Sequence, residues 1–182
     1  SNNTITFNEL AENTYSNCTI TVTDNVSNAS SALSVSSFTI DTTGPTLSEV
    51  TAVTTPTNDT TPNYTFNSNE AGNITIGGSC SSSTSSASSG NNEITFSSLS
   101  AATYSDCTIR VTDSAGNTGD TLPVSSFIID TTAPTLSSTS PADNESSIAI
   151  TDNISITFSE SMSAASVTTN TSNTSCSGSF QL

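Results

Sequence analysis

One long stretch of this sequence occurs twice. Residues 1–48 align with residues 90–137 at a constant offset of 89, without a gap, and 29 of the aligned positions are identical. The shared phrases include VSSFTIDTTGPTLS at 35–48 and VSSFIIDTTAPTLS at 124–137. A period of this length suits one seven-strand β-sandwich, so each period predicts one domain.

The repeat predicts three pieces of domain. One complete domain is expected at 46–133, preceded at 1–45 by the C-terminal half of a similar domain and followed at 134–182 by the N-terminal half of a further one. Pro45 and Pro134 each begin a new unit directly after a DTT turn. The last piece differs enough in sequence to indicate a related module from another subfamily.

Apolar residues are few, but they are regularly placed. They alternate with polar residues in short segments such as CTIRV at 107–111 and ISITF at 154–158. Period two between turn-forming residues is typical of half-buried antiparallel strands, and no segment shows a convincing helical period. The predicted fold class is therefore all-β.

The charge balance excludes several classes of function. The chain has no His, no Lys and one Arg (Arg110), against 16 acidic residues, for a formal net charge of -15. Sites built on His or Lys cannot form, and the net charge would repel nucleic acid or an anionic membrane. Glu70 and Glu160 lie near strand ends, but a chain without Trp lacks an aromatic platform for a sugar-cleaving site. We expect no enzyme, no nucleic-acid partner and no direct membrane insertion by this segment.

Several phrases resemble known surface modules. VTDSAGNTGD at 111–120, FIIDTTAPTLS at 127–137 and TPTNDTTPNYTF at 55–66 resemble the bacterial Ig-like domains strung in tandem through surface adhesins and stalk proteins. SPADN at 140–144 and ISITFSESM at 154–162 resemble the related Ig-like domain of S-layer and surface proteins. The resemblance implies tandem Ig-like β-sandwiches arranged as a linear rod, at the cell surface, that space and present other parts.

A tyrosine corner of an Ig-like domain places the tyrosine two positions before the cysteine, whereas Tyr104 and Cys107 lie three positions apart. We therefore expect them to face opposite sides unless a bulge intervenes.

The four cysteines predict disulfide bonds. Cys80 and Cys107 fall 27 positions apart in the complete domain, where a disulfide suits a secreted sandwich with a thin core. Cys18 is the counterpart of Cys107, so its own partner is expected before residue 1. Cys176 lies in TSCSGS, which is similar to GSCSSS around Cys80, so its partner is expected beyond residue 182.

The two half-domains leave two arrangements open. In the first, the chain is part of a longer covalent array of repeats, and the flanking residues of that array complete both half-domains. In the second, separate copies meet head to tail, with the end of one chain completing the start of the next by strand complementation. The array is favoured, because isolated half-domains would be poorly stable. Either way, the expected partners are further repeats or other copies of this protein.

Acidic residues gather near the predicted domain ends. Asp41 and Asp130 close two units, Asp59 lies in the TNDTTP turn, and Asp143 lies near the start of the last piece. Oxygen ligands from adjoining loops are what Ca²⁺ prefers, and the resemblance implies calcium at such junctions. No other cofactor is expected. The alternative is that these residues end strands as Asx turns, and the VTDSAGNTGD segment presents the same choice.

Together these features predict a structural segment of an extracellular stalk or filament, built from disulfide-stabilised Ig-like domains. The alternative function is an adhesive module that binds a glycan or a host protein through its loops. An exposed aromatic cluster or a concave pocket would favour adhesion.

Overall fold

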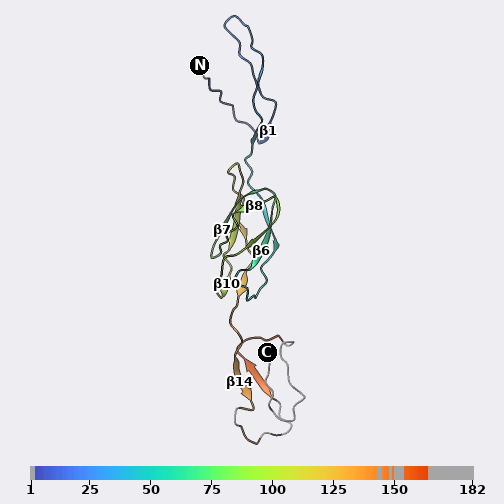
Figure 1. The fold of residues 1–182 in the computed structure, drawn as a ribbon, viewed down its shortest axis with the longest axis vertical. Helices are drawn as coiled ribbons and strands as arrows, with labels where there is room; N and C mark the ends of the chain where they lie inside the picture. The colour runs from blue at the N-terminus through green and yellow to red at the C-terminus, as the bar shows by residue number, and fades with distance from the viewer. Residues whose placement is uncertain (1–2, 143–144, 148, 150–153, 164–182) are drawn as a thin grey trace. The chain divides into compact units, whose positions relative to one another are not determined.

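The computed structural model describes residues 3–142, 145–147, 149 and 154–163. Every regular element in these residues is a β strand, and they include no helix, hence none long and apolar enough to cross a membrane (Figure 1). The predicted all-β class is confirmed. The chain separates into two compact units, residues 1–130 and 131–182. The predicted domain boundaries near residues 45 and 133 stay a prediction.

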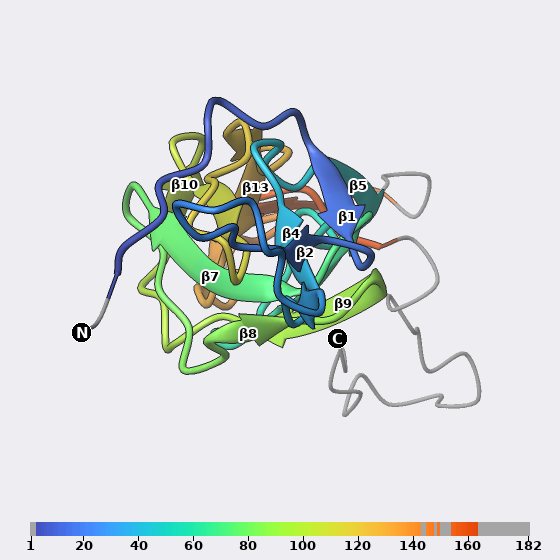
Figure 2. The same cartoon turned by 90° about the horizontal axis from the view of Figure 1, so that it is seen from above.

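The first unit contains a β-sandwich, the central sandwich, over residues 44–130. Its strands are β5 (Leu47–Thr51), β6 (Asn63–Ser68), β7 (Gly72–Gly77), β8 (Ser86–Ala87), β9 (Gly90–Thr95), β10 (Ala102–Tyr104), β11 (Thr108–Thr112), β12 (Leu122–Pro123) and β13 (Phe127–Ile129). One sheet has the order β5-β6-β9, the other has the order β12-β11-β7-β8, and β10 pairs with β13. Figure 2 shows β7 beside β8, as their antiparallel pairing requires.

An apolar core fills the central sandwich. Tyr64 and Phe66 in β6 and Ile109 and Val111 in β11 are completely buried, whereas Arg110 is exposed. Alternation therefore places the few apolar residues of each strand on the face that meets the other sheet. The ring of Phe127 adds stacked contacts to this core, at 5.9 Å from the ring of Phe96 and 5.3 Å from that of Tyr104.

Tyr104 and Cys107 do not face opposite sides. Both side chains point into the core, with exposed fractions of 8% and 2%. The expectation was wrong because β10 ends at Tyr104 and β11 begins at Thr108, so the alternation does not continue across the connection. The Tyr104 hydroxyl donates to the carbonyl oxygen of Ser100 (3.1 Å), which fastens this connection as a tyrosine corner does in Ig-like folds.

Residues 3–43, the N-terminal segment, reproduce the second half of the central sandwich strand by strand. The strands are β1 (Asn13–Tyr15), β2 (Thr19–Ile20), β3 (Leu33–Ser34) and β4 (Phe38–Ile40). β1 pairs with β4 in the register of β10 with β13, and β2 pairs with β3 in the register of β11 with β12. The Tyr15 hydroxyl donates to the carbonyl oxygen of Ala11 (3.0 Å), as Tyr104 does to Ser100.

The second unit contains a hairpin that reproduces β5 and β6. Its described strands are β14 (Leu136–Ser140) and β15 (Ser155–Phe158). Leu136 lies opposite Phe158 as Leu47 lies opposite Ser68, and each strand pair has one register irregularity within its next few residues.

The hydrogen bonds at the open end of this hairpin also recur. The Thr135 N–H donates to Ser159 Oγ (2.9 Å), and the Ser159 N–H donates to the Thr135 carbonyl oxygen (2.9 Å). In the central sandwich, the Thr46 N–H donates to Asn69 Oδ1 (2.7 Å), and the Asn69 N–H donates to the Thr46 carbonyl oxygen (3.2 Å). The β14–β15 hairpin is therefore the structural counterpart of β5–β6, at an offset of 89 along β14 and 90 along β15.

Candidate functional site

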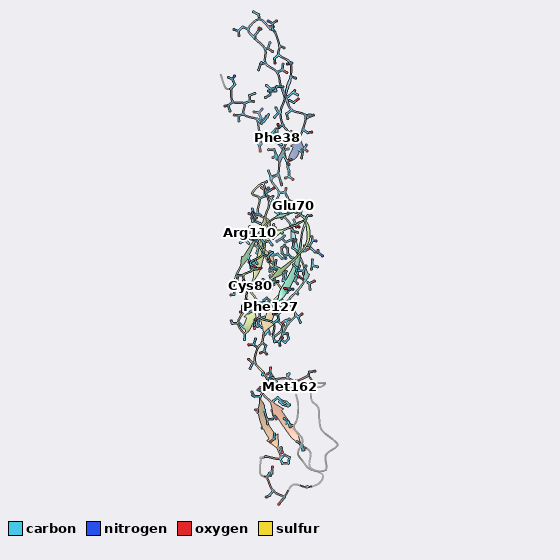
Figure 3. All side chains as sticks on the ribbon, in the orientation of Figure 1. Phe38, Glu70, Cys80, Arg110, Phe127 and Met162 are labelled. Atoms are coloured by element: carbon cyan, nitrogen blue, oxygen red, sulfur yellow. A yellow bond between two sulfur atoms is a disulfide. The ribbon has the colours of Figure 1, made fainter. Side chains whose placement is uncertain are left out.

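One disulfide bond closes the end of a sheet. Cys80 and Cys107 are bonded, with their Cα atoms 5.4 Å apart. Thr108 and Gly77 lie opposite each other in the paired strands β11 and β7, so the bond joins two neighbouring strands just beyond their ladder. Figure 3 places Cys80 and Glu70 toward opposite ends of the central sandwich. This is the pair that the sequence predicted, because both cysteines lie within the one complete domain.

The other two predicted disulfide residues have no such bond in the described structure. Cys18 is half-buried and has no disulfide partner among the described residues. Cys176 lies outside the described residues. The partners expected for Cys18 and Cys176 stay predictions.

The segment that follows β5 lies beside the last segment of the central sandwich. The Thr57 N–H donates to the Ile128 carbonyl oxygen (3.0 Å), and the Asp130 N–H donates to the Thr57 carbonyl oxygen (2.8 Å). The Ile128 N–H donates to Thr55 Oγ1 (2.9 Å). The bridge between Thr57 and Ile129 is parallel. We call residues 55–57 and 128–130 the terminal clamp; no sequence motif marked it.

Glu49 joins β5 to two other parts of the sandwich. Its Oε2 accepts hydrogen bonds from the Tyr64 hydroxyl (3.0 Å) and the Ser125 N–H (3.0 Å), and its Oε1 accepts one from Ser125 Oγ (2.7 Å). Burial by itself raises the pKa of Glu49, but the hydrogen bonds from Ser125 and Tyr64 bring it below its usual value. Burial, together with the hydrogen bond to Glu49, raises the pKa of Tyr64, which keeps the phenol as the donor.

Three carboxylates meet at the end of the sandwich that carries Glu70. Asp41, Glu70 and Asp113 each bring one oxygen within 4.8 Å of the others. They come from the connections after β4, before β7 and after β11. We call these three residues the acidic cluster.

Asp113 is the buried member of the acidic cluster, with 7% of its surface exposed. Its Oδ1 accepts hydrogen bonds from the N–H groups of Ala115 and Asn117, both at 2.8 Å. Burial raises the pKa of Asp113, but the hydrogen bonds, chiefly from Asn117, hold it below its usual value. Asp113 is therefore negatively charged at neutral pH, and it closes the turn that VTDSAGNTGD predicted.

The acidic cluster contains one of the four predicted calcium ligands, Asp41. Asp59 instead accepts hydrogen bonds from the N–H and Oγ1 of Thr61 (2.8 and 3.2 Å), as in an Asx turn. The backbone of Asp130 belongs to the terminal clamp, and Asp143 lies outside the described residues. Calcium at these four positions stays a prediction.

The composition of the acidic cluster is compatible with calcium. Its ligand atoms are all oxygens, which is the donor type that Ca²⁺ takes. The Asn117 Nδ2 group donates to the Asp41 carbonyl oxygen (3.1 Å), so the connection after β4 is already held against the β11–β12 turn. Glu70 and Asp113 were not in the predicted calcium set, because the sequence gives no sign that they lie near Asp41.

The N-terminal segment has an apolar face that the described residues cover only in part. We call this the uncovered face; it consists of Ile5, Phe7, Leu10, Val35, Phe38 and Ile40. All of these except Ile5, together with Asn8, line a cavity of about 400 Å³. Every counterpart of the uncovered face in the central sandwich is buried, with at most 7% exposed: Ile94, Phe96, Leu99, Val124, Phe127 and Ile129. The cavity is therefore lined by counterparts of residues that are buried in the core of the central sandwich.

Comparison with known proteins gives one family match. Residues 130–181 match the family model described as a bacterial Ig-like domain. Searches of the curated proteins and of the solved structures found no match. For that part of the chain, the match agrees with the resemblance read from SPADN and ISITFSESM, and it supports a surface-associated structural or adhesive module.

Proposed function

We propose that this chain is a load-bearing segment of an extracellular stalk or filament, in which Ig-like sandwiches follow one another and transmit tension. The observation that carries the proposal is the terminal clamp. The chain enters the central sandwich before Thr55 and leaves it after Asp130, and the two segments of the clamp run parallel. A pull on the two ends therefore loads the hydrogen bonds of the clamp together, in shear, rather than one after another.

The disulfide bond limits how far a ruptured sandwich can extend. The bond closes a loop with a sequence separation of 27. At about 3.4 Å per extended residue, this loop withholds about 9 nm of chain from the applied force. A stalk built in this way lengthens less when one sandwich unfolds under tension.

The surface charge and the family match support the same role. With a net charge of -15 and one cationic side chain, the chain repels other acidic surfaces, which keeps an extended structure soluble. The bacterial Ig-like match at 130–181 supports a surface module. Calcium at a domain junction is part of this proposal, on the strength of the resemblance.

Single-molecule force spectroscopy on the full chain tests the proposal. Thr55→Val removes the Oγ1 acceptor of the terminal clamp and keeps the size of the side chain, so we expect a lower unfolding force. Thr75→Val, on the exposed side of β7, is the matched control and should not change the force. Reduction of the disulfide should lengthen the unfolding step of the central sandwich by about 9 nm. Equal unfolding forces for the natural chain and Thr55→Val would show that the clamp bears no load.

The adhesive alternative is not favoured by the cavity. A binding pocket combines an apolar lining with a few convergent polar groups. Here the lining residues correspond, position by position, to a sandwich core, so their exposure is explained without a ligand.

A further inference from the structure

We infer that the uncovered face of the N-terminal segment is a docking surface for the β14–β15 hairpin of a second copy of this chain. In this interface residues 154–156, at the start of β15, form an antiparallel pair with residues 3–5 of the other copy, in a defined register. The inference rests on the proposed structural role and names the partner that continues the filament.

The central sandwich supplies the template for this interface. β6 pairs with β9 over its whole length, with Tyr64 opposite Ile94 and Thr65 opposite Glu93. The counterpart of β9 in the N-terminal segment is NTIT at residues 3–6, which aligns with NEIT at 92–95. Residues 3–6 are in no strand pair with any described residue. Among the described residues, the N-terminal segment thus has a β9 equivalent with no β6 equivalent beside it.

The second unit has the opposite deficiency. The β14–β15 hairpin reproduces β5–β6, yet among the described residues β15 has one neighbour strand where β6 has two. Two of its apolar residues are also largely exposed: Ile154 is 70% exposed and Leu136 is 59% exposed. Ile154 is the counterpart of Tyr64, which is completely buried. A strand with an open edge and an exposed apolar face is a template for an added strand.

Transfer of the β6–β9 register predicts the contacts between copies. Ile154 of one copy would lie opposite Ile5 of the other, and Ser155 would lie opposite Thr4. Ile5 is 56% exposed in the single chain, so both isoleucines would become buried together, as Tyr64 and Ile94 are. Because a linear filament needs each copy to bind the next one, the hairpin is expected to act between chains.

Cysteine cross-linking of the full chain tests the register. In a Cys18→Ser, Cys176→Ser background that keeps the Cys80–Cys107 bond, Thr4→Cys is combined with Ser155→Cys. Directly opposite residues have Cβ atoms about 4.5–5.5 Å apart, close enough for a disulfide after a small adjustment. We expect a ladder of linked chains under non-reducing conditions. The matched control, Thr4→Cys with Thr157→Cys, is displaced by two residues, about 7–8 Å, and should give at least about tenfold less product.

Two single substitutions to aspartate test whether the uncovered face takes part in association between copies. Ile5→Asp places a carboxylate where the template has a buried side chain, so it should weaken association by at least about tenfold. Val26→Asp is the control, because Val26 is 76% exposed and its counterpart Ala115 is also exposed. Sedimentation measures the association, and the thermal unfolding midpoint of the central sandwich should be the same in both variants.

Three results would overturn the inference. These are a cross-link within one chain, equal cross-linking by Ser155→Cys and Thr157→Cys, and a natural chain that stays monomeric at every concentration tested. The last result would also point to neighbouring residues of a longer chain as the source of the hairpin. None of these results bears on the role proposed for the terminal clamp, which the force measurement tests separately.

Discussion

Glu49 makes the stability of the central sandwich depend on pH. Its pKa is lowered in the folded chain, below an unfolded value of about 4.3. The stabilisation is therefore present above about pH 4.3 and is lost as the pH falls through the folded pKa. We expect Glu49→Gln to unfold at a lower temperature than the natural chain at pH 7, and the difference to narrow below about pH 4.

Thermal unfolding followed by circular dichroism between pH 7 and pH 3 measures this effect. Glu93→Gln, an exposed residue of β9, controls for the loss of one charge. If the difference in unfolding temperature between Glu49→Gln and the natural chain stays constant over this pH range, Glu49 does not account for the pH dependence.

Substitution of Glu70 tests whether the acidic cluster binds calcium. Three carboxylates within 4.8 Å repel one another, and a bound divalent cation would relieve this repulsion. We expect calcium to raise the unfolding temperature of the natural chain relative to a chelator; a ligand at about 100 times its Kd stabilises by about 2.7 kcal/mol. Glu70→Gln should lose most of this increase, and Glu93→Gln should keep it. Identical unfolding temperatures in calcium and in chelator would contradict the prediction.

At the scale of the strands, the disulfide bond should contribute much of the stability of the sandwich. With a sequence separation of 27, the chain-entropy model gives about 3.5 kcal/mol. The double variant Cys80→Ala, Cys107→Ala should lose about this much in the free energy of unfolding, measured by urea titration. Cys18→Ser is the control, since Cys18 has no disulfide partner among the described residues. A double variant as stable as the control would contradict this prediction.

The turn between β11 and β12 approaches the start of the sandwich very closely. A Cβ atom on Gly119 would lie 1.9 Å from the carbonyl oxygen of Pro45. Gly119→Ala must therefore displace backbone, and we expect a loss of about 1–3 kcal/mol. Ser114→Ala, in the exposed part of the same turn, should change the stability by less than about 0.5 kcal/mol. An equal effect of both substitutions would show that the turn is free to move.

At the scale of the whole molecule, the net charge of -15 opposes contact between copies. The Debye length falls from about 30 Å at 0.01 M salt to about 8 Å at 0.15 M. If copies associate through the uncovered face, salt should strengthen association, because apolar burial remains while repulsion is screened. Sedimentation at increasing NaCl measures the association. Weaker association at high salt would instead indicate attraction between unlike charges.

Much of the fold could be predicted because it depends on local pattern and on repetition. Alternation identified Ile109 and Val111 as core residues, and the position of Cys80 and Cys107 within one complete domain led to the prediction of their disulfide bond. The alternation failed between Tyr104 and Cys107, since two separate strands meet there.

The groups that define the candidate sites could not be predicted in this way. Glu49 and Ser125 are 76 positions apart, as are Asp41 and Asn117, and no periodicity relates them.

The sequence alone was therefore sufficient to predict the all-β class, the repeat and the disulfide, because strand alternation and the positions of cysteines follow directly from the order of the residues. Three features could be found only in the tertiary structure. They are the parallel terminal clamp, the proximity of Asp41 to Glu70 and Asp113, and the exposure of Ile5 and Phe7. Each of these depends on which distant strands lie beside one another. Ile94 is buried, whereas Ile5, its counterpart in the repeat, is exposed. The reason is that β6 lies beside Ile94, and no equivalent strand lies beside Ile5 among the described residues.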